Sequence, residues 1–320
     1  MKRHLVAVDI GGSKTAILVV EANTHRKVYS EKLKTPADSG VGAMLRLLDD
    51  QLDELPGGRT SIRALGVAVP GPVDEKGHVV RAGNLEGWVD VPLRAQLEDR
   101  YHVPTFVERD ANCGALGEKW LGAAKKLKDF VFLALGTGVG AGLFLNGAIY
   151  RGAHFAAGEV GDMTFSPDGK RKSSPPSVSD IVGKNAIKKM ARRATGEKLS
   201  AAEALERAAT EGRLERATRK AVAYLSTSVV VLASALDPEA ILFGGGTSEA
   251  GEALLRRIRE TVAPRLTLRA RLQFAGLGWE SQLYGALWGA EKALSAGARR
   301  GSPRDWFARP AQRRASGSSS

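Results

Sequence analysis

The chain has 320 residues, 43% of them hydrophobic, and a formal net charge of +12. This length and composition predict a globular protein of about two domains, and no apolar run is long enough to suggest a membrane span. The single cysteine, Cys113, excludes an internal disulfide, and residues 1–4 lead directly into an apolar strand without a secretory signal, so we expect a cytoplasmic protein.

Two segments share one design, in which an apolar strand is followed by a glycine-rich turn and a second apolar strand. They are residues 5–20 and 130–145, and each predicts a buried β-hairpin whose turn can present backbone N–H groups to phosphate. The spacing of the glycines matches neither a P-loop nor a dinucleotide-binding turn. A simple tight turn explains either hairpin alone equally well, but two copies predict a phosphate clamp with one turn in each half.

Strands alternate with helices in the first half of the chain, which is typical of an α/β layer fold. In the second half helices dominate, and we expect Ser179 to cap the first of them. Between and beyond the hairpins, the predicted strands are 27–34, 62–69, 103–107, 240–243 and 271–274, and the predicted helices are 42–54, 112–120, 180–193, 201–209, 214–236, one starting at 248, and 280–294.

The repeated hairpin predicts two similarly built lobes with a cleft between them. We expect residues 1–113 to form a small α/β lobe and 114–283 a larger α/β lobe, with the last helix, 284–296, returning to the first. Residues 297–320 hold six arginines and one acidic residue among Gly, Ser and Pro, and they predict a disordered basic tail. The positive charge suits a polyphosphate substrate or contact with nucleic acid, and charge alone does not separate these.

Charged residues stand beside the turns and strand ends where α/β folds bind ligands. Asp9 precedes the first turn, where a carboxylate can orient hydrated magnesium or simply cap its own turn. Lys14 either meets phosphate or lies in solvent. Asp110 can accept the proton of an attacking hydroxyl, and the alternative is that Asp110 or Asn112 caps the following helix.

Six motifs follow one another in a fixed order along the chain. They are Asp9 to Thr15, Gly83 to Trp88, Glu108 to Glu118, Gly136 to Gly142, Tyr150 to Asp162 and Leu242 to Gly246. This ordered set resembles the ROK family of sugar kinases and repressors, and the resemblance extends from Leu5 to Leu294. It implies an α/β, two-lobed actin-like (ribonuclease H-like) ATPase fold that binds ATP between the lobes and a hexose at the base of the cleft.

The resemblance also implies roles for individual residues. Asp110 corresponds to the general base that activates the sugar's 6-hydroxyl. The magnesium site expected at Asp9, most simply through water, rests instead on the place of Asp9 before the first glycine turn. The implied sugar ligands are Asn84, Arg109, Asp110, Glu159 and Asp162. The implied ATP-binding residues are Asp9, Gly11, Gly12, Ser13, Lys14, Thr137 and Gly138 around the phosphates, with Gly245 and Gly246 beside the adenosine.

The chain departs from the family pattern on the sugar side. Arg109 stands where relatives have asparagine, and Asp162 stands where they have a histidine that accompanies a zinc-binding cysteine cluster. Residues 166–179 contain no cysteine, so no zinc is expected. Arg109 and Asp162 either alter the choice of sugar or pair with each other.

The resemblance therefore implies a kinase that uses ATP and Mg²⁺ to phosphorylate a hexose, with glucose as the leading substrate. Alternatives are N-acetylglucosamine, N-acetylmannosamine, mannose, fructose or an acidic sugar, polyphosphate in place of ATP, and a sugar-binding regulator without catalysis. A homodimer is implied. The first strand begins near Leu5, which leaves no room for a preceding DNA-binding helix-turn-helix, so specific nucleic-acid binding is not expected.

Overall fold

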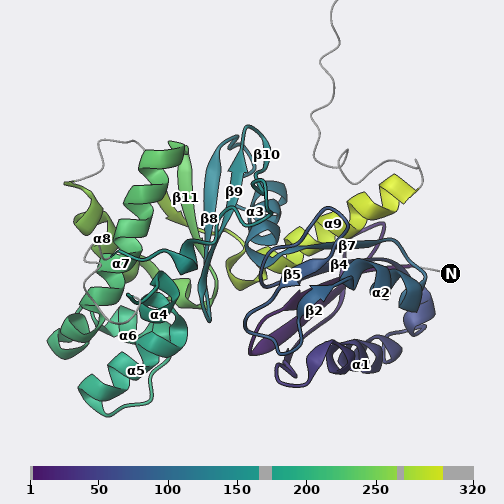
Figure 1. Cartoon of the computed structure of the whole chain (residues 1–320), viewed down its shortest axis with the longest axis horizontal. Helices are drawn as coiled ribbons and strands as arrows, with labels where there is room; N and C mark the ends of the chain where they lie inside the picture. The colour runs from purple at the N-terminus through teal and green to yellow at the C-terminus, as the bar shows by residue number, and fades with distance from the viewer. Residues whose placement is uncertain (1–2, 166–174, 265–269, 298–320) are drawn as a thin grey trace, which may run out of the picture.

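The computed structural model describes residues 3–165, 175–264 and 270–297. Two five-stranded sheets form the centres of two lobes that lie side by side, with the earlier part of the chain in one and the later part in the other (Figure 1). Most of the cysteine-free segment 166–179, namely residues 166–174, lies outside the described residues, and so does the predicted basic tail beyond residue 297.

The first sheet has the strand order β3-β2-β1-β4-β7. Strand β1 (His4–Ile10) pairs antiparallel with β2 (Lys14–Glu21) and parallel with β4 (Ile62–Val69). Strand β3 (Lys27–Lys34) extends the antiparallel edge, and β7 (Thr105–Arg109) extends the parallel edge. The predicted first hairpin is confirmed.

Helices cover both faces of this sheet because β1 is apolar on both sides. Val6 and Val8 pack in one core with α1 (Gly40–Asp53) and α2 (Leu93–Tyr101). Leu5 and Ala7, which point to the opposite face, pack in a different core with residues of the last helix. A strand buried on both faces in this way is held rigidly, which fixes the turn that follows it.

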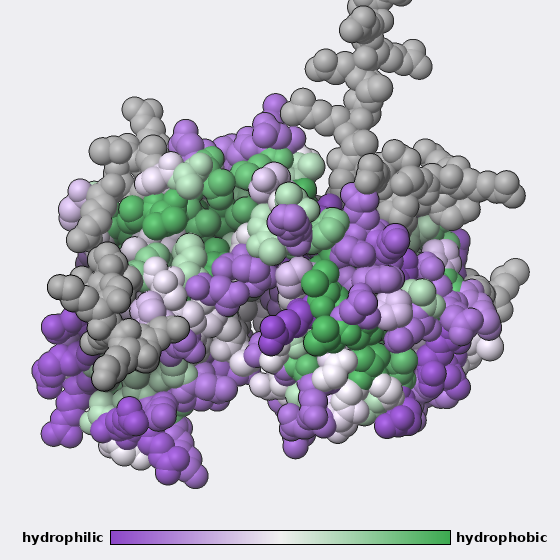
Figure 2. Space-filling model, in the orientation of Figure 1, coloured by the Kyte–Doolittle hydropathy of each residue, from purple (hydrophilic) through white to green (hydrophobic). Residues whose placement is uncertain are grey.

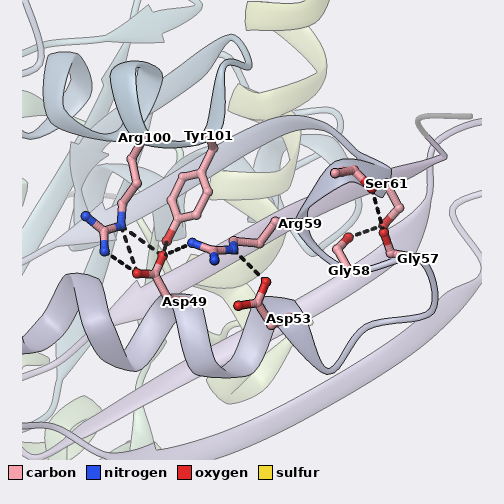
Figure 3. Close-up of polar contacts among 9 residues, drawn as sticks. Asp49, Asp53, Gly57, Gly58, Arg59, Ser61, Arg100 and Tyr101 are labelled. Atoms are coloured by element: carbon pink, nitrogen blue, oxygen red, sulfur yellow. Dashed lines mark hydrogen bonds and ion pairs between the residues drawn. The ribbon is translucent and has the colours of Figure 1, made fainter.

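A polar cluster ties the outer helices of this lobe together (Figure 3). The Asp49 carboxylate of α1 accepts hydrogen bonds from Arg59 at 2.9 Å and from the Tyr101 hydroxyl at 3.0 Å, and it also binds Arg100 of α2. Hydrogen bonding by Arg100 lowers the pKa of Asp49. The Asp49 carboxylate therefore stabilises the fold at pH values above its pKa in the unfolded chain. This contribution is lost as the pH falls through its lower pKa in the native protein.

The second sheet repeats the first, with the order β10-β9-β8-β11-β12. Strand β8 (Phe130–Leu135) pairs antiparallel with β9 (Val139–Leu145) and parallel with β11 (Ala240–Gly244), which confirms the second hairpin. Strand β12 (Arg271–Phe274) lies beyond β11, and β10 (Ala148–Ile149) lies beyond β9. The two hairpins thus occupy equivalent places in equivalent sheets.

Helices of the second half pack on the second sheet. The longest, α7 (Gly212–Leu236), is apolar enough by length and composition to cross a membrane, but its buried residues belong to the core of this lobe. The other helices here are shorter. The set comprises α4 (Val178–Val182), α5 (Lys184–Thr195), α6 (Ala201–Arg207), α7 (Gly212–Leu236) and α8 (Gly251–Val262).

Two helices, α3 (Asp110–Trp120) and α9 (Ser281–Gly297), lie between the sheets (Figure 1). Phe130 and Phe132 of the second sheet share one core with α9 and with Leu5 of the first. The chain passes from the first sheet to the second through α3, and the predicted boundary at residue 113 falls inside this helix. The lobes therefore share a continuous apolar seam.

The sequence-based prediction differs from the structure in several places. The expected helix over 180–193 is two helices, because Gly183 breaks it, and its N-cap is Ser177 rather than Ser179. The expected strand over 103–107 begins and ends two residues later, as β7, and the helix expected from residue 248 begins at Gly251, as α8. Helix α2 and the short strands β5 (Val79–Arg81), β6 (Val89–Val91) and β10 were not predicted.

Candidate active site

A cleft of about 1040 Å³ opens between the two lobes, and the surface is visibly hollowed there (Figure 2). Every residue that the sequence assigned to phosphate, nucleotide or sugar contributes to its lining. These residues are Asp9, Gly11, Gly12, Ser13, Lys14, Asn84, Arg109, Asp110, Thr137, Gly138, Glu159, Asp162, Gly245 and Gly246. The structure thus brings together segments that lie up to two hundred and thirty-seven positions apart in the chain.

The first turn is held by Thr35, which was not predicted as a site residue. Its hydroxyl donates to the Gly11 carbonyl at 2.6 Å, and its N–H donates to the Ser13 carbonyl at 3.2 Å. Within the described residues, the N–H groups of Gly12 and Ser13 have no protein acceptor. A turn with its carbonyls engaged and N–H groups free is suited to bind an anion.

The second turn has the same property by different means. The hydroxyl of Ser179 accepts from the Val139 N–H at 3.1 Å, and the Gly136 N–H closes the turn onto the Gly138 carbonyl at 3.0 Å. As far as the described residues go, the N–H groups of Thr137 and Gly138 likewise donate to no protein group. Ser179, expected as a helix cap, instead fixes this turn.

Two carboxyl groups that line the cleft, those of Asp9 and Asp110, interact through their charges. Burial and, after it, the negative charge of Asp110 together raise the pKa of Asp9 to about 7, while the charge of Lys32 opposes the rise. Burial also raises the pKa of Asp110, while the charge of Arg109 and the Ala111 N–H lower it. Among the described residues the Asp9 carboxyl accepts no hydrogen bond, so it does not cap its own turn.

The predicted capping role for this segment is not what the structure shows. Asp110 is the first residue of α3, and its Oδ1 accepts from the neighbouring Ala111 N–H at 2.6 Å, while Arg109 occupies the cap position. The Asn112 amide donates to buried Glu108 at 3.0 Å. Glu108 also pairs with Arg151, so this buried carboxylate is charge-neutralised, and of the two acids in this segment it is Asp110 that lines the cleft.

Arg109 is buried, with a side chain only 2% exposed, and it pairs with Glu159 across the cleft floor at 2.9 Å. Its other terminal nitrogen donates to the Ala141 carbonyl. The predicted alternative, a pair with Asp162, is not formed, because Glu159 takes that place and Asp162 is exposed. Arg109 therefore joins the end of β7 to the strand and loop that carry Glu159.

Asn84 is held against the first turn by close packing. A β-carbon on Gly12 would lie 2.9 Å from that of Asn84, so only glycine allows this approach. Gly245 adopts a φ of 83° beside the backbone of Leu135, which suits glycine for a similar reason. The turn after β11 is thereby brought against the end of β8.

Sequence analysis missed Thr35, Ser179, Arg151 and Lys184, whose contacts become visible only in three dimensions. Lys184 is the first residue of α5 and reaches across the cleft to Ser13, with 3.4 Å between its Nζ and the hydroxyl oxygen. The expected absence of zinc stays a prediction, since residues 166–174 lie outside the described part.

The chain belongs to the ROK family, whose family model matches residues 5–292. It has the two-lobed actin-like fold of that family. It is 30% identical to a glucokinase of Halalkalibacterium halodurans over 89% of this chain and 94% of that protein. It is 31% identical to a xylose repressor of Caldicellulosiruptor bescii over 82% of this chain and 70% of the repressor.

A solved structure shows the same fold with ligands bound. It is a ROK family glucokinase from Streptomyces griseus in complex with glucose and AMPPNP, with a TM-score of 0.75 and 28% sequence identity. The match covers 90% of this chain and 99% of that one. That structure therefore contains a sugar and an ATP analogue bound to one enzyme.

Proposed function

We propose that this protein transfers the γ-phosphoryl group of ATP to a hydroxyl of a neutral hexose, with glucose as the preferred acceptor. It is a sugar kinase of the ROK family. The observation that carries the specific proposal is the single cleft in which two turns with free N–H groups stand beside Asp110. Phosphoryl transfer requires charge stabilisation, positioning and one base, and this cleft offers each of them.

Asp110 is the proposed base. Its pKa is raised by burial, which makes the carboxylate a better proton acceptor near neutral pH than an exposed aspartate. It takes the proton from the acceptor hydroxyl as the sugar oxygen forms its bond to phosphorus and the bond to the leaving ADP oxygen breaks. Arg109 next to it stabilises the ionised form before the proton arrives.

The donor set fits a hydrated magnesium ion. The Asp9 carboxyl accepts no hydrogen bond from the described residues. The charge that affects its pKa most is that of a second carboxylate, Asp110. Mg²⁺ favours one or two carboxylates with water and phosphate oxygens, and it would neutralise charge on the phosphates when bound. Because the pKa of Asp9 is about 7, metal binding should release a proton and strengthen as pH rises through neutrality.

The Arg109–Glu159 pair favours a neutral sugar over an acidic one. The guanidinium is already neutralised by Glu159 and is nearly inaccessible, so it offers little attraction to a carboxylate on the substrate. Asp110 and Asp162 add negative charge to the same region of the cleft. An acidic sugar would meet repulsion from these groups that a neutral hexose would not.

A coupled assay that follows ADP formation across a set of acceptors tests this proposal. We expect the highest kcat/KM for glucose, lower values for mannose, fructose, N-acetylglucosamine and N-acetylmannosamine, and the lowest for gluconate, which has a hydroxyl acceptor and a carboxylate. EDTA serves as the control that removes magnesium. Turnover of none of these sugars would contradict the kinase proposal, and preference for gluconate would contradict the neutral-sugar proposal.

The non-catalytic alternative predicts a different result from the same protein. A regulator would bind sugar, and show a thermal shift with it, without consuming ATP. The presence of Asp110 in the lining of the same cleft as the two glycine turns supports catalysis over this alternative. The homodimer, the cytoplasmic location and the disorder of the basic tail stay predictions.

A further inference from the structure

Lys184 connects the two glycine turns. Its backbone N–H donates to the Gly136 carbonyl in the second turn at 2.9 Å. Its side chain extends to the Ser13 hydroxyl in the first turn, 3.4 Å away on the opposite lobe. One residue therefore has its main chain fixed to one turn and its charged group at the other.

The start of α5 is built to allow this approach. A β-carbon on Gly183 would lie 2.5 Å from the Thr137 carbonyl oxygen and 2.6 Å from that of Ser179, so any larger residue would push the helix away. Glycine here brings the first residue of α5 to the rim of the cleft. The close contact explains why the expected continuous helix over 180–193 is interrupted at this position.

The charge of Lys184 is not matched by the protein. In the described ranges it forms no ion pair, and its neighbours Lys188 and Lys14 are also cations. Burial, followed by these two lysines, lowers its pKa. A partly buried ammonium among like charges disfavours the unliganded state, and a multivalent anion between the turns would relieve this.

We propose that Lys184 binds the terminal phosphates of the donor nucleotide between the two glycine turns. This rests on the proposed kinase function. The free N–H groups of Gly12, Ser13, Thr137 and Gly138 stand in the same cleft lining as Lys184. Phosphate oxygens that bridge these groups would replace the long hydrogen bond to Ser13 with shorter charge-assisted ones. Lys184 would then draw the second lobe toward the first when the phosphates arrive.

Isothermal titration with AMPPNP and with AMP, in the presence of Mg²⁺, tests this assignment on Lys184→Ala. We expect a loss of about 10-fold or more in AMPPNP affinity and less than about 2-fold in AMP affinity, because AMP lacks the terminal phosphates. KM for ATP should rise similarly, with KM for the sugar nearly unchanged. Lys184→Arg should retain most of the AMPPNP affinity.

Lys188→Ala is the matched control, because it removes the same charge one turn further along α5 from an exposed position. It should leave AMPPNP affinity within about 2-fold of wild type. An equal loss in both variants would indicate a general charge effect and overturn the assignment to Lys184, as would unchanged AMPPNP affinity or equal losses for AMPPNP and AMP. Lack of AMPPNP binding and turnover by the wild type would overturn the kinase proposal itself, which separates the two failures.

Discussion

Arg109 is an almost fully buried residue that holds other groups of the cleft in place. A guanidinium has the planar, multiple donors needed to hold Glu159 and the Ala141 carbonyl together, and lysine does not. Its Nε is buried without a hydrogen-bond partner within the described chain. One donor of the guanidinium is therefore unsatisfied, even though the charge is balanced by Glu159. We interpret Arg109 as the residue that positions Glu159 for the sugar.

Replacement of Arg109 by lysine tests this interpretation. We expect Arg109→Lys to raise KM for the sugar about 10-fold, because Glu159 loses its geometry, and to change KM for ATP less than about 2-fold. Steady-state kinetics with each substrate varied in turn measures both. Arg46→Lys, an exposed position on α1, is the control. Equal increases in both KM values would instead indicate a general disturbance of the cleft.

At the level of elements, α9 approaches α3 more closely than most helix pairs can. A β-carbon on Gly285 would lie 1.7 Å from the Cys113 carbonyl oxygen, a distance that no side chain tolerates. The carboxylate of Glu118, fully buried in α3, fastens the same pair by accepting from the Gly276 and Leu277 N–H groups and the Ser281 hydroxyl. The seam between the lobes thus depends on glycine packing and one satisfied buried acid.

We therefore expect Gly285→Ala to destabilise the protein by about 3 kcal/mol, because the helices must separate or the backbone must shift. The melting temperature in differential scanning calorimetry should fall by roughly 4–5 °C for a chain of this length. Gly212→Ala at the start of α7 is the control, since its nearest atom is an Arg216 nitrogen at an ordinary 3.5 Å. A melting temperature unchanged by Gly285→Ala would contradict this account of the seam.

The elements that were predicted from the sequence are those whose own residues form a recognisable apolar pattern. The two hairpins, the strand β4 and the long helix α7 have continuous or periodic apolar patterns that determine their type. Helix α2 was missed although its buried positions, Leu93, Leu97 and Tyr101, recur at four-residue steps, because the helix has only nine residues and few apolar ones among its charged residues. The break at Gly183 was missed because its cause, the Thr137 carbonyl, lies far away in the sequence.

The same distinction holds for the candidate site. Residues in the ordered motifs, such as Asp9 and Asp110, line the cleft, and their proposed roles stay predictions. Thr35 and Lys184 stand outside those motifs, and their contacts with the first turn depend on how separate segments fold together. The partner of Arg109 also required the structure, because charge alone allowed Asp162 as well as Glu159.

At the scale of the whole molecule, the duplicated sheets place two equivalent turns on opposite sides of one cleft. The helices α3 and α9 form the shared seam beneath it, and α3 begins with Asp110. A small rotation about this seam would change the separation of the turns while leaving the base at the cleft floor. Closure around two substrates would exclude water from the reaction.

The central claim is that Asp110 is the base of an ATP-dependent hexose kinase, and one measurement tests it most directly. Glucose-dependent ADP formation is compared between the wild type and Asp110→Asn, with AMPPNP and glucose affinities measured on both proteins. We predict that kcat falls about 1000-fold in the variant while both affinities stay within roughly 3-fold, because asparagine keeps the shape and loses the base. A kcat within 10-fold of wild type would contradict the account.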